Sequence, residues 1–248
     1  MTASLLAAIV GVSLVIGIAI GATGIGGVLL VPFLTLTLGI DVRRAIAAVL
    51  LSYLPSCVAA VWLYGRRGSI PWREAKLICL AALPGAWAGA RVAQHAPATL
   101  LELAIGVLLL GGGIYSLLPP RPVGARTLSA ATLLALGAGT GVLAAITGAG
   151  GAFVLLPVLL LLDMPVLPAI GLGMAIALPV AIVASAANLA AGLLDLWLAL
   201  GIGAALTLGI AVGTPIAHAL PQLLLRRLLG STVLLAGLAM LARTAARL

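Results

Sequence analysis

Charged side chains are scarce in this sequence: 7% of its 248 residues are Asp, Glu, Lys or Arg, and five of these are acidic. Hydrophobic residues make up 64% of the chain. A water-soluble domain covers its core with polar side chains, so this composition excludes a soluble globular protein. Apolar runs of about 20 residues recur, each long enough to cross a bilayer as a helix. The runs are continuous rather than alternating, which predicts an all-α polytopic membrane protein and not a β-barrel.

Catalytic signatures are also missing. The sequence has no Gly-x-Ser-x-Gly elbow, no His-Glu-x-x-His pair and no cluster of carboxylates, so we expect neither an enzyme nor a cofactor. Cys57 and Cys79 lie inside apolar runs and are expected to pack as small apolar side chains. The net charge of +8 does not indicate nucleic acid, because the basic residues lie in short polar breaks where they orient a membrane protein.

The apolar runs predict long helical spans in both halves of the chain, with a short apolar piece in each. The long spans are 3–22, 45–64, 74–93, 99–118, 128–147, 167–191, 196–217 and 222–242, and the short pieces are 27–39 and 151–163. The short pieces are too brief to cross a bilayer comfortably. The first run has no basic residue before it, and we expect it to be a retained span rather than a signal peptide. The predicted division is a first membrane repeat (1–120), a cytoplasmic linker (121–127) and a second membrane repeat (128–248).

The two halves resemble each other. "TGIGGVLLVP" begins at Thr23, and "TGAGGAFVLLP" begins at Thr147, 124 residues later. The same offset relates further pairs: Ala45-Ile46 and Ala169-Ile170, Leu54-Pro55 and Leu178-Pro179, Gly89 and Gly213, Gly106 and Gly230. A constant offset of half the chain length predicts an internal duplication.

The basic residues change sides between the halves. "YGRRGSIPWREAK" (64–76) carries four basic residues and is expected to face the cytoplasm, while its counterpart "NLAAGLLDLW" (188–197) carries none. Conversely, "ARVAQHAPATLLE" (90–102) has one arginine, whereas "AHALPQLLLRR" ends in two. This swap predicts two inverted repeats, related by an axis in the membrane plane and joined after an odd number of crossings.

The glycine-rich motifs are expected to break helices. Glycine tolerates backbone angles that other residues avoid, and the helix that starts after each break has N–H groups without intrahelical partners. Those groups and the positive end of the helix dipole favour an anion. The predicted binding residues at the breaks are Gly24, Gly26, Gly27, Gly148, Gly150 and Gly151, with Thr23 and Thr147 as hydroxyl donors or helix caps. The alternative is that these glycines merely permit close helix packing.

A few polar residues inside the spans are further candidates. Asn188 is costly to bury alone, so it either bonds another helix or faces a cavity. Ser52 and Tyr53, just before Pro55, are predicted to line the same cavity as Asn188. Asp195 is expected to cap a helix. Four tryptophans near span ends are expected to anchor the protein at the membrane interface: Trp62, Trp72, Trp87 and Trp197.

These motifs give the chain a family resemblance. Gly-x-Gly-Gly followed by an apolar run and proline, then "GI…A" and "LP", together with "YGRRGSIPWREA" and "LPGAWAGARVA", resembles the sulfite exporter TauE/SafE family over essentially the whole chain. The resemblance implies a bacterial inner-membrane, multi-pass transporter of sulfite, sulfonates or related organic anions. It places the family's glycine motif at 23–32 and 147–157.

The sequence therefore predicts a secondary carrier that binds a small anion between two glycine breaks and works by rocking one repeat against the other. The expected partners are the anionic substrate and the lipid bilayer, and a homodimer is plausible from the many small residues. Two alternatives stay open: a passive anion channel, and a non-transporting membrane scaffold or anchor.

Overall fold

The computed structural model describes residues 3–23, 26–118, 128–162, 164–216 and 222–246. In these ranges all regular structure is helical. The helices are α1 (Ala3–Thr23), η1 (Gly27–Leu29), α2 (Leu30–Pro32), η2 (Phe33–Thr37), α3 (Val42–Arg66), α4 (Trp72–His95), α5 (Ala98–Leu117), α6 (Ala130–Thr147), α7 (Gly151–Leu161), α8 (Val166–Ala190), α9 (Leu196–Ile216) and α10 (Gln222–Ala245). The predicted linker 121–127 lies outside the described residues.

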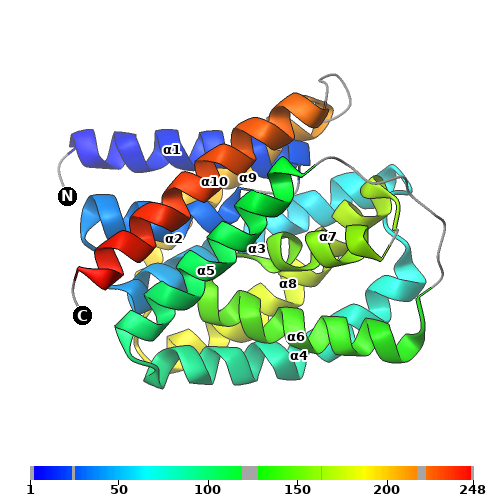
Figure 1. Ribbon diagram of the computed structural model, residues 1–248, viewed down its shortest axis with the longest axis horizontal. Coiled ribbons are helices and arrows are strands. Elements are labelled where there is room, and N and C mark those ends of the chain that lie inside the picture. Colours follow the sequence, from blue (N-terminus) through cyan, green and yellow to red (C-terminus); the bar gives the residue numbers. More distant parts are fainter. Residues whose placement is uncertain (1–2, 24–25, 119–127, 163, 217–221, 247–248) are drawn as a thin grey trace.

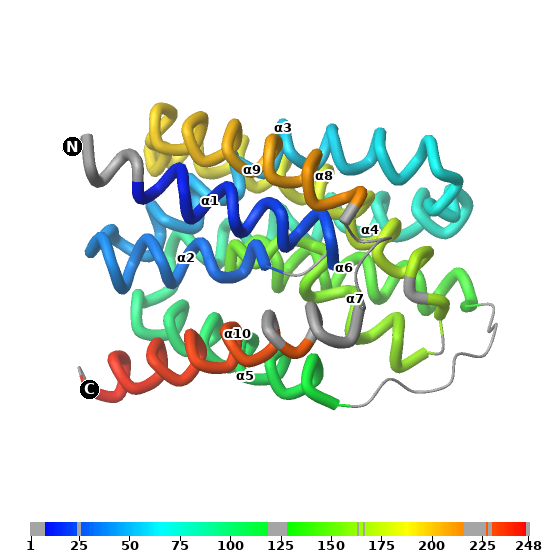
Figure 2. The backbone as a smooth tube through the Cα atoms, turned by 90° about the horizontal axis from the view of Figure 1, so that it is seen from above, coloured from blue at the N-terminus to red at the C-terminus, as the bar shows by residue number. Residues whose placement is uncertain are grey.

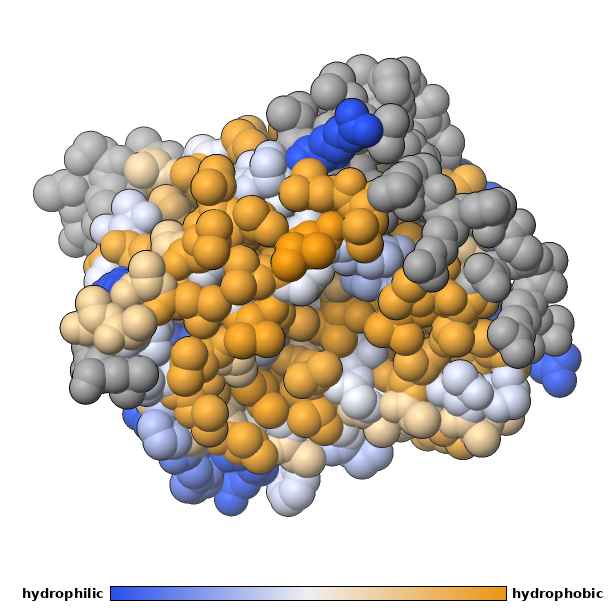
Figure 3. All heavy atoms as spheres, viewed as in Figure 1, coloured by the Kyte–Doolittle hydropathy of each residue, from blue (hydrophilic) through white to orange (hydrophobic). Residues whose placement is uncertain are grey.

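The all-α membrane architecture predicted from the sequence is confirmed. Six helices of the described ranges are long and apolar enough to cross a membrane: α3, α4, α5, α6, α8 and α9. The predicted spans at 3–22 and 222–242 correspond to α1 and α10. Large apolar side chains such as Leu80, Val107 and Leu208 are more than half exposed, as lipid-facing side chains of spanning helices are. Figure 3 shows that apolar residues cover the middle of one face, with strongly hydrophilic residues near its edges.

The helices are arranged around a central pair. α3 and α8 contact each other, and each also contacts one helix of the opposite half, α9 and α4 respectively. α1 lies along α9, α6 along α4 and α5 along α10, as Figures 1 and 2 show. Every one of these three outer pairs joins one half of the chain to the other. The halves therefore interlock instead of packing as two separate units.

Glycines in these pairs make equivalent contacts in both halves. A Cβ atom at Gly85 of α4 would overlap the backbone oxygen of Ala138 in α6, and a Cβ atom at Gly209 of α9 would overlap that of Leu14 in α1. The two contacts are equivalent in the duplication, because Gly85 corresponds to Gly209 and Leu14 corresponds to Ala138, each 124 residues apart. Gly89 against Val142 and Gly213 against Ile18 repeat the relation. Small residues let these helix backbones touch, and the duplication preserves the contact.

The α5–α10 pair bears on how the halves are oriented. A Cβ atom at Gly106, early in α5, would meet Leu241, late in α10, whereas one at Gly113, late in α5, would meet Leu234, earlier in α10. The two equivalent helices thus run antiparallel. A twofold axis perpendicular to the helices would make two equivalent helices run antiparallel. The inverted relation of the repeats stays a prediction, and this geometry supports it.

Candidate functional site

Both glycine motifs interrupt the helical structure. α1 ends at Thr23, Gly24 lies outside the described residues, and Gly26 has a φ of 143°. α6 ends at Thr147, and Gly148 and Gly150 have φ values of 66° and 76°. Side chains other than glycine rarely adopt these positive φ angles. The sequence therefore dictates a backbone turn at each motif before the next helical segment begins.

Each short segment starts against the middle of a long helix. η1 begins at Gly27, where a Cβ atom would overlap the hydroxyl oxygen of Tyr53 in α3. α7 begins at Gly151, where a Cβ atom would lie 2.5 Å from Cγ2 of Ile176 in α8. Gly27 and Gly151 are equivalent in the duplication, being 124 residues apart. The two breaks therefore present the starts of two helical segments to the central helices.

The threonines at the breaks do not cap these starts, so that part of the prediction is wrong. The residues preceding η1 and α7 are Gly26 and Gly150, and no side chain bonds there as a cap. Thr147 instead donates to the oxygen of Leu143 (2.7 Å), and Thr23 donates to that of Ala19 (2.8 Å). Each threonine ends the preceding helix, where a carbonyl four residues back is the nearest acceptor. The first N–H groups of α7 thus have neither an intrahelical nor a capping partner.

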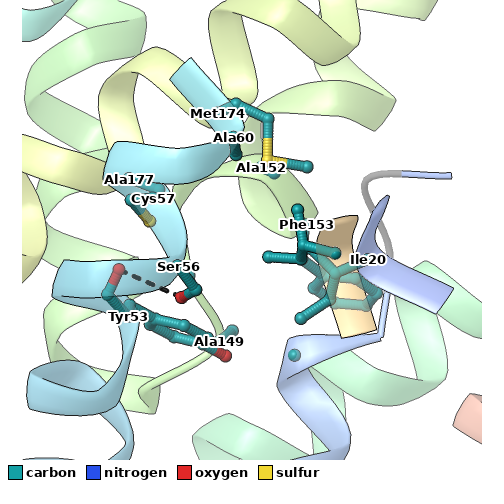
Figure 4. A pocket seen from close by; sticks show the side chains of 13 residues that line it. Ile20, Tyr53, Ser56, Cys57, Ala60, Ala149, Ala152, Phe153, Met174 and Ala177 are labelled. Carbon is teal, nitrogen blue, oxygen red and sulfur yellow. Dashed lines mark hydrogen bonds between the residues drawn. The ribbon is translucent and has the colours of Figure 1, made fainter. Parts of the chain in front are cut away.

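A cavity of about 30 Å³ lies between the breaks and the central helices. Figure 4 shows side chains from α1, α3, α7 and α8 around it. The lining residues are Ile20, Gly27, Tyr53, Ser56, Cys57, Ala60, Ala149, Gly150, Ala152, Phe153, Met174, Ala177 and Ile210. The volume holds little more than a water molecule, so an anion of the size of sulfite does not fit there without movement of the lining.

Tyr53 occupies the space between the two breaks. Its side chain is 5% exposed, and its hydroxyl group donates to the backbone oxygen of Gly148 at 3.4 Å. A Cβ atom at Gly150 would lie 3.3 Å from the tyrosine ring. The residue equivalent to Tyr53 in the second half is Ala177, which also lines the cavity. The site is therefore asymmetric, with one bulky aromatic hydroxyl from the first half only.

Few polar groups face the cavity. Among the described residues that line it there is no Lys, Arg or His, and the polar side chains are those of Tyr53, Ser56 and Cys57. Ser56 donates to backbone oxygens of its own helix, those of Tyr53 (3.1 Å) and Ser52 (3.3 Å). Among the described groups beside the cavity, the start of α7 is the one that favours an anion.

The structure brings some predicted site residues together and separates others. Tyr53, Gly27 and Gly150 line the cavity, and Gly26, Gly148 and Gly151 form the adjoining turns. Ser52 is not among the lining residues; its hydroxyl donates to the backbone oxygen of Val49 within α3, and its backbone lies against Gly203 of α9.

Asn188 does not line the cavity either. It lies near the end of α8 and accepts a hydrogen bond of 3.3 Å from Gln94 Nε2 of α4. Of the two roles weighed for Asn188, the structure has the bond to another helix. The amide therefore ties together two helices of opposite halves.

Sequence reasoning missed Ser56, Cys57 and Ala60. They follow Tyr53 at intervals of three, four and seven residues, which places them on the same helix face. Their spacing from Tyr53 therefore predicts that they face the same cavity.

Two further polar residues have clear partners. Asp195 accepts from the backbone N–H of Leu198 at 3.0 Å, which confirms it as the cap of α9. Glu102, at the start of α5, is buried and accepts a hydrogen bond of 3.0 Å from the Thr244 hydroxyl of α10.

The chain is similar to known membrane proteins. The family model described as "Sulfite exporter TauE/SafE" matches residues 8–240. A protein of Bacillus subtilis (strain 168) named "Probable membrane transporter protein YdhB" is 26% identical over 242 residues, covering 94% of this chain and 99% of that protein. No solved structure matches the chain.

Proposed function

The chain belongs to the sulfite exporter TauE/SafE family, and on this premise we propose that it is a secondary carrier for small anions such as sulfite, sulfonates or related organic acids. The anion binds between the two glycine breaks. The observation that carries this proposal is the cavity whose lining includes residues of both breaks, α3 and α8. We place the protein in the bacterial plasma membrane, with the bilayer and the substrate as its partners and a homodimer as its possible assembly.

The chemistry of the breaks supports an anionic ligand. The unpartnered N–H groups at the start of α7 carry the positive end of its dipole. Gly150 lines the cavity and has no side chain to keep a ligand away from the main chain. The Tyr53 hydroxyl group is a further hydrogen-bond donor for the anion once its bond to the backbone oxygen of Gly148 is broken. Discontinuous helices hold anionic groups near the midplane of other transporters in this way.

Transport requires this small cavity to widen enough to admit an anion. We propose that the repeats rock against each other and move Tyr53 out of the space between the breaks. The two halves contact each other along three helix pairs, and these are the surfaces along which they would slide. The α1–α9 and α4–α6 pairs are equivalent to each other in the duplication, and the α5–α10 pair joins two helices that are each other's equivalents. In the α1–α9 and α4–α6 pairs, glycines bring the two helix backbones into direct contact.

Uptake of labelled sulfite into proteoliposomes, with and without a pH gradient and with taurine, sulfoacetate, sulfate and acetate as competitors, tests the proposal. Saturable uptake that one competitor suppresses supports a carrier. Flux that rises linearly with anion concentration supports a passive channel. A protein that is folded and inserted but gives no flux with any of these anions contradicts the proposal and leaves the scaffold as the better account.

A further inference from the structure

A groove of about 490 Å³ lies on the surface where α3 ends and α4 begins. Its lining combines the apolar side chains of Val58, Val61 and Leu178 with the indole rings of Trp62 and Trp72. Arg66, in the last turn of α3, also lines it. The groove thus changes from apolar to cationic toward the end of a spanning helix.

The side chains of the groove are held in place by one another. The guanidinium carbon of Arg66 lies 4.7 Å from the ring centroid of Trp62, a distance typical of a cation–π contact. A Cβ atom at Gly65 would lie 3.3 Å from the Trp72 ring, so glycine lets that ring lie against α3. Both indole rings are more than half exposed. The two tryptophans are therefore fixed but open to a ligand.

The charge around the groove is basic. Within the described ranges, no carboxylate forms an ion pair with the exposed Arg66. Arg67, Arg73 and Lys76 follow in the same stretch of chain, with Glu74 as its one acidic residue. Tryptophan and arginine at the end of a spanning helix lie at the level of lipid headgroups, and basic residues there attract anionic lipid.

The internal duplication supplies a comparison. The positions 124 residues after Trp62, Arg66 and Trp72 are Ala186, Ala190 and Leu196. The equivalent place in the second half therefore lacks both rings and the cation. Helix packing is preserved between the halves without them, so the packing of the fold does not require these three side chains.

We propose that this groove binds an anionic phospholipid, with an acyl chain along Val58, Val61 and Leu178 and the phosphate at Arg66. The apolar lining suits an acyl chain, and the one guanidinium in the lining, that of Arg66 at the end of α3, complements a headgroup with one negative charge. This site is separate from the anion cavity and does not depend on the transport proposal.

Native mass spectrometry of the purified full chain, titrated with dioleoyl phosphatidylglycerol or dioleoyl phosphatidylcholine, tests the site. The wild type is expected to prefer phosphatidylglycerol, and Arg66→Gln is expected to lower that preference about fivefold. Trp72→Leu introduces the residue type found at the equivalent position in the second half, Leu196, and should weaken binding of both lipids. Arg73→Gln is the matched control, because it removes an equal charge from the first turn of α4, outside the groove lining.

A second measurement needs no variant. Brominated phosphatidylglycerol is expected to quench tryptophan fluorescence of the wild type at lower mole fraction than brominated phosphatidylcholine. Equal binding and equal quenching by the two lipids would overturn the proposal. So would an equal loss of preference in Arg66→Gln and Arg73→Gln, because the attraction would then be diffuse rather than sited in the groove.

Discussion

The hydroxyl group of Tyr53, in the middle of α3, donates a hydrogen bond of 3.4 Å to the backbone oxygen of Gly148 in the second break. A residue of the first half thus closes the break of the other half. In the proposed carrier, this hydroxyl exchanges its carbonyl partner for the anion when the repeats move.

Replacing Tyr53 by Phe removes that donor and keeps the ring. We expect the KM for the transported anion to rise at least about tenfold, the loss typical of one hydrogen bond to a charged group. Maximal flux should change less, because the ring that lines the cavity is retained. Concentration-dependent uptake in proteoliposomes measures both quantities, and an unchanged KM would remove Tyr53 from the site.

Methyl groups at the starts of the two short segments should block the site. Gly27→Ala places a Cβ atom on the Tyr53 hydroxyl, and Gly151→Ala places one against Ile176. Overpacking of this kind costs about 1–3 kcal/mol, and we expect initial flux to fall about tenfold or more in either variant. Gly201→Ala is the matched control, because nothing lies within 4 Å of that position. A Gly201→Ala loss as large as the other two would show a general effect on the fold.

The charge of the substrate follows from the lining of the cavity. The lining residues that the structure describes include no basic side chain, and the partial charge of helix termini offsets about one negative charge at most. We therefore expect methanesulfonate, a monoanion, to compete with labelled substrate better than sulfate, a dianion of similar shape. Sulfite flux should rise as pH falls through the range where sulfite takes up a proton. Stronger competition by sulfate would contradict this electrostatic account.

The equivalent contacts between halves predict equivalent losses of stability. Gly85→Ala overlaps the oxygen of Ala138, and Gly209→Ala overlaps that of Leu14. Both variants are expected to lower the unfolding temperature in detergent by similar amounts, corresponding to about 1–3 kcal/mol each. Gly139→Ala, in α6 with nothing within 4 Å, should leave it unchanged. If only one of the two variants lowers the unfolding temperature, the two contacts are not equivalent, and the halves would not slide against each other along equivalent surfaces.

Helix positions were largely predictable from the sequence, because continuous apolar runs bounded by charged or glycine-rich breaks leave few alternatives. The predicted spans 45–64 and 74–93 fall within α3 and α4. The piece predicted at 27–39 is less regular than expected: it starts as a 3-10 turn and ends as a π-helical turn at Phe33–Thr37. Composition does not reveal such changes in hydrogen-bond register.

The site was predictable only in part. Glycine repeats located both breaks, since positive φ angles have a strong sequence signature. The side-chain lining was harder, because α3 and α8 are apolar on all faces and their patterns do not tell which face meets the cavity. Ser52 and Asn188 were therefore assigned to the site, whereas their hydroxyl and amide groups bond to α3 and α4.

Alkylation of Cys57 tests the location of the anion most directly. Cys57 is 5% exposed and lines the cavity, and Cys79→Ala leaves it as the single thiol. The account predicts that a transported sulfonate slows alkylation of Cys57 by a membrane-permeant reagent, with half-protection at the concentration that half-saturates flux. An alkylation rate that stays constant while the same sulfonate saturates flux would contradict binding between the two breaks.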